Sequence, residues 1–281
     1  MIIPDITLYN GVKVPQIGLG VFLMEEEEEA KWAIQRAIKT GYRHFDTASI
    51  YGNEEFLAKA LLKSEMNRNE FFLTSKVWNN RQGYSQTKEA FQESIDKLQT
   101  DYLDLYLIHW FGVDVKGTWR AMEELYEEGK IRAIGVSNFT IDHLESMKEF
   151  ARIMPMINQV ETHPYFPQNE LRDYMQKEEI AHQAWGPLSQ GKSDLLMHPL
   201  LYEIGKKYGK TPAQITLKWH TERNTIVIPK SVHSRRIAEN FDLFDFTLTE
   251  EDMKAIEEMN MEARFGRDPL DWEFVERTSR E

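Results

Sequence analysis

Four side chains in the first half of the chain form a set that could move a proton. Tyr51 lies five residues after Asp46 in the segment DTASIYGNE, and Lys76 and His109 each directly follow an apolar run. A phenol titrates near pH ~10 and is a poor acid at neutral pH, but a neighbouring ammonium lowers its pKa and a carboxylate keeps that ammonium charged. We therefore predict that Tyr51 donates a proton, with its pKa lowered by Lys76 and Lys76 held by Asp46. A histidine at position 109 could orient the acceptor oxygen or relay a proton.

These side chains need a scaffold that brings them together, and the chain alternates between apolar runs and amphipathic stretches. Eight runs read as strands, at residues 17–20, 43–46, 71–76, 103–108, 131–137, 156–160, 180–185 and 225–229. Helical patterns lie between them, at residues 31–39, 54–63, 87–98, 118–128, 141–150 and 169–177. The alternation continues without a break in composition, and it predicts one closed (β/α)8 TIM barrel.

A doubly wound open sheet is the alternative architecture. Its G-x-G-x-x-G fingerprint is absent, because Gly18 and Gly20 are followed by no third glycine at the required place. Before the barrel, residues 7–16 alternate around Asn10-Gly11 and predict a β-hairpin in which both turn residues take positive φ. The acidic run Glu25–Glu29 predicts the start of the first barrel helix, where carboxylates complement the helix dipole.

The bulk composition limits the class of protein. The 281 residues fit a single barrel domain over 1–281, and the net charge of -12 opposes binding to nucleic acid or to an anionic membrane surface. Without cysteine, disulfides and thiolate metal sites are excluded. The start MIIPDITLYN carries no basic region followed by a long apolar stretch, so we expect a cytoplasmic protein with no membrane span. Nothing in the pattern demands an obligate interface, and we expect a monomer.

In barrels of this kind the active site lies at the carboxyl ends of the strands. Polar or aromatic residues close almost every predicted strand here, and together they predict a single site at one mouth of the barrel. They are Asp46, Lys76, His109, Ser137, Asn138, Gln159, Trp185 and Lys230.

Several segments together resemble the aldo-keto reductase superfamily, in particular the bacterial branch that includes 2,5-diketo-D-gluconate reductases. They are GYRHFDTASIYGNE, LTSKVW, DYLDLYLIHW, GVSNF, QVETHPY, WGPLSQGKS and IPKSVHSRRIAEN, and their order and spacing match from about Leu8 to Asn260. The resemblance implies NADPH-dependent reduction of a small carbonyl substrate, and it places a catalytic tetrad on Asp46, Tyr51, Lys76 and His109. Small aldehydes, dicarbonyls, keto acids and sugars all remain open as substrates.

The resemblance also assigns the residues around the cofactor. Asn138 and Gln159 would bind the nicotinamide carboxamide, and Trp185 would stack on the nicotinamide ring. The full expected set is Gly20, Asp46, Ser137, Asn138, Gln159, Trp185, Gly186, Pro187, Leu188, Gln190, Gly191, Lys230, Ser231, Val232, His233, Arg236 and Asn240. Phe22, Trp78, His109 and Trp110 would contact the substrate, although simple barrel packing also explains Trp110.

A preference for NADPH is expected from the stretch Lys218–Arg236, which carries five cations against one carboxylate. The end of the last strand and the start of the following helix place cations and free N–H groups where phosphate binds well. By resemblance, Lys230, Ser231 and Arg236 would hold the adenosine 2′-phosphate, and Asn240 the adenine. His233 stands where relatives often carry arginine, which weakens the expectation of strict selectivity.

Three other functions are compatible with parts of the sequence. Residues 186–193 satisfy the phosphate-loop pattern G-x-x-x-x-G-K-S of nucleotide hydrolases, but Pro199 follows early and no acidic partner for magnesium is evident. We assign this loop to the cofactor pyrophosphate instead. A metal hydrolase using Asp46, His109, Glu161 and His163 would lack the H-E-x-x-H motif, and we expect no metal. A non-catalytic cofactor sensor is the third alternative, although all four tetrad positions are filled.

Overall fold

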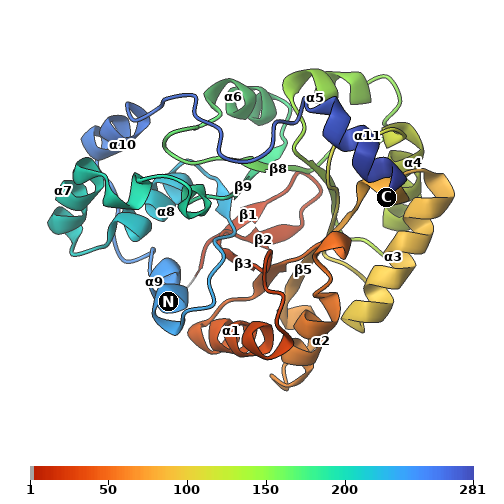
Figure 1. The fold of residues 1–281 in the computed structure, drawn as a ribbon, viewed down its shortest axis with the longest axis horizontal. Coiled ribbons are helices and arrows are strands. Elements are labelled where there is room, and N and C mark those ends of the chain that lie inside the picture. The colour runs from red at the N-terminus through yellow and green to blue at the C-terminus, as the bar shows by residue number, and fades with distance from the viewer. Residues whose placement is uncertain (1–2) are drawn as a thin grey trace.

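Eight parallel strands form the centre of the protein (Figure 1). The computed structural model describes residues 3–281, so Met1 and Ile2 of the expected domain lie outside the description. The strands are β3 (Gly18–Gly20), β4 (His44–Asp46), β5 (Phe72–Val77), β6 (Leu105–Ile108), β7 (Ile134–Ser137), β8 (Ile157–Glu161), β9 (Ala181–Trp185) and β10 (Ile226–Val227). They are paired in chain order, and a parallel bridge between Ile17 and Val227 joins the two edges. The predicted (β/α)8 barrel is confirmed, and the open-sheet alternative is wrong.

Gly20 shows why the closing strands need small residues. A Cβ atom at this position would come within 2.8 Å of the carbonyl oxygen of Ile228, in the chain that follows β10. That distance is shorter than a side-chain carbon can tolerate beside a backbone oxygen. The glycine at position 20 is therefore required by closure of the barrel, whatever else it contacts.

Helices cover the outside of the barrel in Figure 1. Their bounds are α1 (Glu27–Thr40), α2 (Glu54–Leu62), α3 (Tyr84–Leu98), α4 (Val115–Glu127), α5 (Ile141–Met147), α6 (Asn169–Lys177), α7 (Pro199–Tyr208), α8 (Pro212–Glu222), α9 (Ser234–Phe241), α10 (Glu250–Glu257) and α11 (Trp272–Arg280). In α1, Ala33, Ile34 and Ala37 are buried, and three glutamates occupy the first turn, as the acidic run predicts. No helix within residues 3–281 has both the length and the apolar character needed to cross a bilayer.

The predicted hairpin is present, but its turn differs from the expected one. Strands β1 (Asp5–Thr7) and β2 (Lys13–Pro15) are antiparallel, and within the turn only Gly11 takes a positive φ, of 87°. The side chain of Asn10 instead accepts a hydrogen bond from the Val12 backbone N–H at 3.1 Å. The asparagine therefore stabilises a longer turn with its side chain rather than by adopting a left-handed backbone.

Two helices follow the barrel. In Figure 1 the blue C-terminal chain runs from α10 past α6 and β8 to α11. The Asn79 side chain donates a hydrogen bond to Thr278 at 2.7 Å, and this contact fixes α11 to the chain that follows β5. The C-terminus thus returns to the mouth of the barrel, and the strand-helix pattern of the sequence did not predict this.

Candidate active site at the mouth of the barrel

The structure brings together the four residues predicted to move a proton, at the carboxyl ends of β4, β5 and β6. The ammonium of Lys76 donates to Asp46 Oδ1 at 2.6 Å and to the Thr47 carbonyl oxygen at 2.8 Å. Tyr51 lies in a short 3-10 turn after β4, and Lys76 Nζ is 5.1 Å from the centre of its ring. The ring of His109 meets the Tyr51 ring edge-on, with 5.7 Å between centroids. The phenol is therefore flanked by a cation and an imidazole.

Asp46 is fixed from both sides. Besides Lys76 at one carboxylate oxygen, Gln159 Nε2 donates to Asp46 Oδ2 at 2.7 Å from β8, on another side of the barrel. The Asp46–Lys76 pair is almost completely buried, with the two side chains 3% and 0% exposed. A buried pair with both oxygens bonded keeps one geometry, because either charge left alone would be costly. The network therefore holds Lys76 in place beside Tyr51.

The predicted effect of Lys76 on Tyr51 is present, but it does not dominate. Burial raises the pKa of the Tyr51 phenol, the charge of Lys76 opposes this rise, and the net direction is upward. For Lys76, burial acts to lower the pKa of the ammonium, but Asp46 and Tyr51 raise this pKa by more than burial lowers it. The net direction is upward, so the lysine remains charged. The structure thus corrects the expectation of a lowered phenol pKa. Tyr51 is kept protonated by its surroundings, and Lys76 limits how much the loss of its proton costs.

His109 is neutral at physiological pH. Burial is the main cause that lowers the pKa of its imidazole well below the usual value, and the charge of Lys76 lowers it further. A neutral imidazole can donate one hydrogen bond without adding charge. Of the two roles expected for His109, orienting a carbonyl oxygen is therefore favoured over relaying a proton.

Aromatic rings lie around the phenol and the imidazole, among them the side chains predicted to contact the substrate. Phe22 is 45% exposed, and its ring lies 4.9 Å from that of Tyr51. Trp78 meets His109 edge-on at 5.0 Å, and Trp110 stacks at 6.5 Å from the same imidazole. Trp110 is only 8% exposed, which agrees with the packing explanation of this residue.

One residue of this aromatic group was missed in the sequence. Phe274 of α11 meets Trp110 edge-on at 5.3 Å and Trp78 at 6.1 Å. The signal that could have found it is the aromatic DWEF segment, which lies beyond the last element of the barrel pattern. The segment between α10 and α11 is also held at the mouth, because Glu161 at the end of β8 accepts hydrogen bonds from the backbone N–H groups of Phe265, at 2.7 Å, and Gly266, at 2.9 Å.

The residues expected to contact the nicotinamide are adjacent to one another. The amide nitrogen of Asn138 donates to the His109 carbonyl oxygen at 3.0 Å and to Ser137 Oγ at 3.1 Å, and its oxygen accepts from Trp185 Nε1 at 2.8 Å. Asn138 adopts a left-handed backbone with φ of 61°, which turns the chain sharply at the end of β7. Both of its amide hydrogens are therefore used within the protein, and only the second lone pair of its oxygen is left for a ligand.

The loop after β9 is not the phosphate loop of a nucleotide hydrolase. Ser189, Gln190 and Gly191 have φ of 53°, 54° and 69°, and the next α-helix begins only at Pro199. In a phosphate loop the lysine side chain reaches the terminal phosphates. Here Lys192 Nζ instead donates a hydrogen bond to the Phe265 carbonyl oxygen at 3.1 Å. The hydrolase alternative fails because the helix N-terminus that must face the phosphate is absent from this place. Consecutive left-handed residues are strained, and such strain is typical of ligand-binding loops.

The basic stretch expected to bind phosphate is divided by the fold. Lys230 and Arg236 are exposed around the start of α9, and the nearby Ser231 side chain accepts from the His233 N–H at 3.1 Å. Lys218 instead pairs with Glu222 at 3.1 Å within α8, and Arg223 lies before β10, at the other end of the barrel. Only the later part of the stretch, with Lys230 and Arg236, can therefore bind a ligand at the mouth of the barrel.

Of the other expected cofactor residues, Leu188 and Val232 are partly buried against the core and Asn240 is buried.

No group of three or more metal-ligating side chains occurs anywhere in residues 3–281. Glu161 and His163, the other two ligands that a metal hydrolase would need, bond to each other through Oε1 and Nε2 at 3.2 Å, while Asp46 is engaged by Lys76. These carboxylates are therefore used for internal contacts.

With this geometry established, the chain can be compared with known proteins. The model of the aldo/keto reductase family matches residues 16–261. The chain belongs to the aldo/keto reductase family. It is therefore an oxidoreductase that uses a nicotinamide cofactor, and helix α11 with Phe274 lies beyond the residues that the family model matches.

Individual relatives cover almost the whole aldo/keto reductase chain. Glyoxal reductase of Bacillus subtilis (strain 168) is 51% identical over 265 residues, 94% of this chain and 95% of that protein. Methylglyoxal reductase DkgA of Escherichia coli (strain K12) is 42% identical over 267 residues, 94% of this chain and 96% of its own length. Among solved structures, an aldo-keto reductase from a deep-sea metagenome library matches with a TM-score of 0.93 at 46% identity, covering 95% of this chain and 98% of that one. A Bombyx mori aldo-keto reductase in complex with NADP matches with a TM-score of 0.90 at 34% identity, covering 95% and 96%.

Proposed function

We propose that this aldo/keto reductase reduces aldehydes and ketones with NADPH, and that Tyr51 is the proton donor. The observation that carries the proposal is the buried Asp46–Lys76 pair placed under the Tyr51 ring, with the neutral His109 on the other side of the phenol. A carbonyl oxygen that gains negative charge during reduction needs a proton and a fixed hydrogen-bond donor. Tyr51 supplies the first and His109 the second.

The bound dinucleotide supplies the hydride, and the protein supplies orientation and the proton. As negative charge develops on the carbonyl oxygen, the Tyr51 hydroxyl donates its proton to it. Lys76 stabilises the resulting phenolate, and Asp46 and Gln159 keep the lysine from moving. His109 donates a hydrogen bond to the same oxygen and so sets which face of the carbonyl is presented.

The side chains present fit a dinucleotide. Trp185 is partly exposed and offers an aromatic face for the nicotinamide, while Gln159 keeps its carbonyl oxygen for the carboxamide because its nitrogen is bonded to Asp46. The left-handed loop Ser189–Gly191 would hold the pyrophosphate through backbone N–H groups. Lys230, Ser231 and Arg236 around the start of α9 would hold the 2′-phosphate.

Small dicarbonyls are the substrates that we propose first. The relatives named as glyoxal and methylglyoxal reductases act on compounds of this class, and their identity of 51% and 42% extends over nearly the full chain. The aromatic rings of Phe22, Trp78, Trp110 and Phe274 around the phenol would accept a small, weakly polar molecule. All four tetrad residues come from one chain, so we also propose that a single domain and a single subunit are sufficient.

The test is to follow NADPH oxidation with a panel of aldehydes, dicarbonyls, keto acids and sugars, for the wild type and for Tyr51→Phe. Loss of the general acid should lower turnover by about 10²- to 10⁴-fold while cofactor affinity, measured by quenching of tryptophan fluorescence, stays near the wild-type value. Tyr202→Phe is the matched control, because Tyr202 is an exposed tyrosine of α7. If Tyr51→Phe retains wild-type turnover while chemistry limits the rate, Tyr51 is not the donor. If the wild type binds NADPH but reduces nothing in the panel, a sensor function replaces the enzyme.

A further inference from the structure

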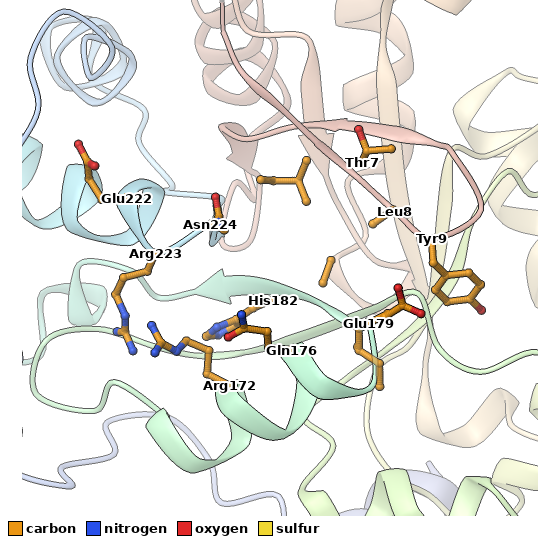
Figure 2. A pocket seen from close by; sticks show the side chains of 13 residues that line it. Thr7, Leu8, Tyr9, Arg172, Gln176, Glu179, His182, Glu222, Arg223 and Asn224 are labelled. Carbon is orange, nitrogen blue, oxygen red and sulfur yellow. The ribbon is translucent and has the colours of Figure 1, made fainter.

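A cavity of about 450 Å³ lies at the end of the barrel opposite the proposed active site. It is bounded by the hairpin residues 6–9, by the chain from α6 into β9, and by the residues between α8 and β10 (Figure 2). The amino ends of β9 and β10 open toward this cavity, whereas Lys76 lies at the carboxyl end of β5 and Tyr51 follows β4. The cavity and the carbonyl-reducing site therefore share no residue.

A buried arginine lines this cavity. The Arg223 side chain is only 3% exposed, and its guanidinium carbon lies 4.2 Å from the centre of the Trp219 ring. Its Nη2 donates to Asn169 Oδ1 at 2.6 Å. Its Nε and Nη1 have no hydrogen-bond partner within residues 3–281. A guanidinium remains charged in proteins, so these are donors of a buried cation that the described fold leaves unused.

Two further side chains that line the same cavity each have a nitrogen without a hydrogen-bond partner. Arg172 Nε and His182 Nδ1 are also buried and lack a partner within the described chain. Figure 2 shows the guanidinium ends of Arg172 and Arg223 turned toward one another, with His182 beside them. Burial first, and the nearby charge of Arg172 second, lower the pKa of Arg223 to about 10. The two cations thus lie close enough to repel each other.

Each guanidinium has one carboxylate within 4 Å, but these carboxylates leave the buried nitrogens without a hydrogen bond. Asp173 Oδ1, in a largely exposed side chain, accepts a hydrogen bond from Arg172 Nη2 at 3.3 Å and does not bond Arg172 Nε. Glu257 is 3.8 Å from Arg223 Nε, too far for a hydrogen bond. Glu222 pairs with Lys218, and in Figure 2 Glu179 lies near Tyr9, away from the guanidinium ends. Three buried guanidinium nitrogens without a partner, Arg172 Nε and Arg223 Nε and Nη1, are therefore left beside a cavity large enough for a polyatomic anion and water.

We propose that this cavity binds a small oxyanion of the phosphate class, which bridges Arg172 and Arg223. An oxyanion would accept hydrogen bonds from the unpartnered guanidinium nitrogens and would remove the repulsion between the two charges. Inorganic phosphate and the phosphate group of a small metabolite both have this chemistry. The bound anion links α6 to the residues that follow α8, in a cavity that the hairpin also lines. It thereby stabilises the end of the barrel opposite the proposed active site.

Thermal unfolding in phosphate and in chloride, at equal pH and ionic strength, tests the proposal. NADP⁺ is kept saturating, so that phosphate cannot act through the cofactor site. The wild type should show a saturable rise in melting temperature that is specific to phosphate. In Arg172→Gln and Arg223→Gln the phosphate concentration at half effect should rise roughly tenfold or more, because each variant loses a charged donor. Lys254→Gln, which removes an exposed cation of α10, should respond as the wild type does.

Equal responses of the wild type and Arg172→Gln, or no phosphate-specific rise in the wild type, would show that the cavity holds only water and overturn the proposal. Arg172 is partly exposed, so Arg172→Gln remains decisive even where Arg223→Gln fails to fold. Titration with glycerol 3-phosphate separates the two sources of the anion. Tighter binding of this ester than of inorganic phosphate identifies the ligand as a phosphorylated metabolite, whereas weaker binding identifies it as free phosphate.

Discussion

Replacing Lys76 by methionine should destabilise the protein strongly as well as inactivate it. The side chain is completely buried, and its ammonium bonds Asp46 Oδ1 at 2.6 Å. Methionine keeps most of the volume but leaves the Asp46 carboxylate buried with Gln159 as its remaining side-chain donor. Removing one partner of a buried pair typically costs about 3–5 kcal/mol of unfolding free energy, a large share of a total of about 5–15 kcal/mol. At about 2–4 °C per kcal/mol, the melting temperature should fall by roughly 6–20 °C.

A double-mutant cycle with Asp46→Asn separates the pair from its surroundings. The Asp46→Asn change retains a side-chain oxygen that can accept from Gln159 Nε2, so the double variant leaves no unpaired charge and keeps the Gln159 amide bonded. We expect the double variant to lose less unfolding free energy than the sum of the two single variants, by at least about 1–2 kcal/mol. Urea titrations of the four proteins measure this difference, and NADPH oxidation measures activity in parallel.

Alkaline pH gives an independent check of the same pair. The folded-state pKa of Lys76 is raised above its usual value, so its contribution is fully present below about pH 10.5 and is lost as pH rises through the folded pKa. The part of the alkaline destabilisation that belongs to Lys76 should therefore be missing in Lys76→Met. Additive losses in the cycle, or a single variant that loses less than about 1 kcal/mol, would contradict the buried-pair account.

Four further changes test other parts of the structure. Arg236→Ala should weaken NADPH binding by roughly ten- to a hundredfold in fluorescence titrations and leave NADH binding nearly unchanged; equal losses, or a wild type that prefers NADH, would refute the 2′-phosphate role. Lys192→Ala should lower NADPH affinity only modestly, and ATP hydrolysis with magnesium that depends on Lys192 would contradict the loop geometry. Glu161→Gln should raise the KM for carbonyl substrates more than it lowers kcat, because it loosens the segment at Gly266; a change in kcat alone would contradict this. Burial lowers the pKa of His182 from 6.5 to about 3, so the unfolded chain binds more protons between these values and stability falls as pH drops below about 6.5. His182→Gln should reduce that slope by at most about 1.4 kcal/mol per pH unit, and an unchanged slope in acid titrations would argue against a buried neutral imidazole.

The sequence alone predicted the barrel, which the structure confirms, and it named four side chains that the structure brings together at the mouth of the barrel. Eight short apolar runs alternate with helical patterns, and parallel strands with this spacing close in only a few ways. The mouth residues could be named because nearly all of them lie in or directly after the last residues of a predicted strand, and the carboxyl ends of parallel strands meet at one end of the barrel. The loop at 186–193 shows the limit of a motif, because its letters fit a phosphate loop while its backbone does not.

Only the tertiary structure decided the features that depend on burial or on contacts distant in sequence. The net direction of the Tyr51 pKa follows from how deeply the phenol is enclosed, and a sequence does not state this. Phe274 lies far from Trp110 along the chain and meets it only because α11 returns to the mouth. The division of the basic stretch has the same cause. Arg223 lies before β10 and Lys230 lies after it. Because the chain crosses the barrel from one end to the other along this strand, the two cations lie at opposite ends of the barrel although they are close in sequence.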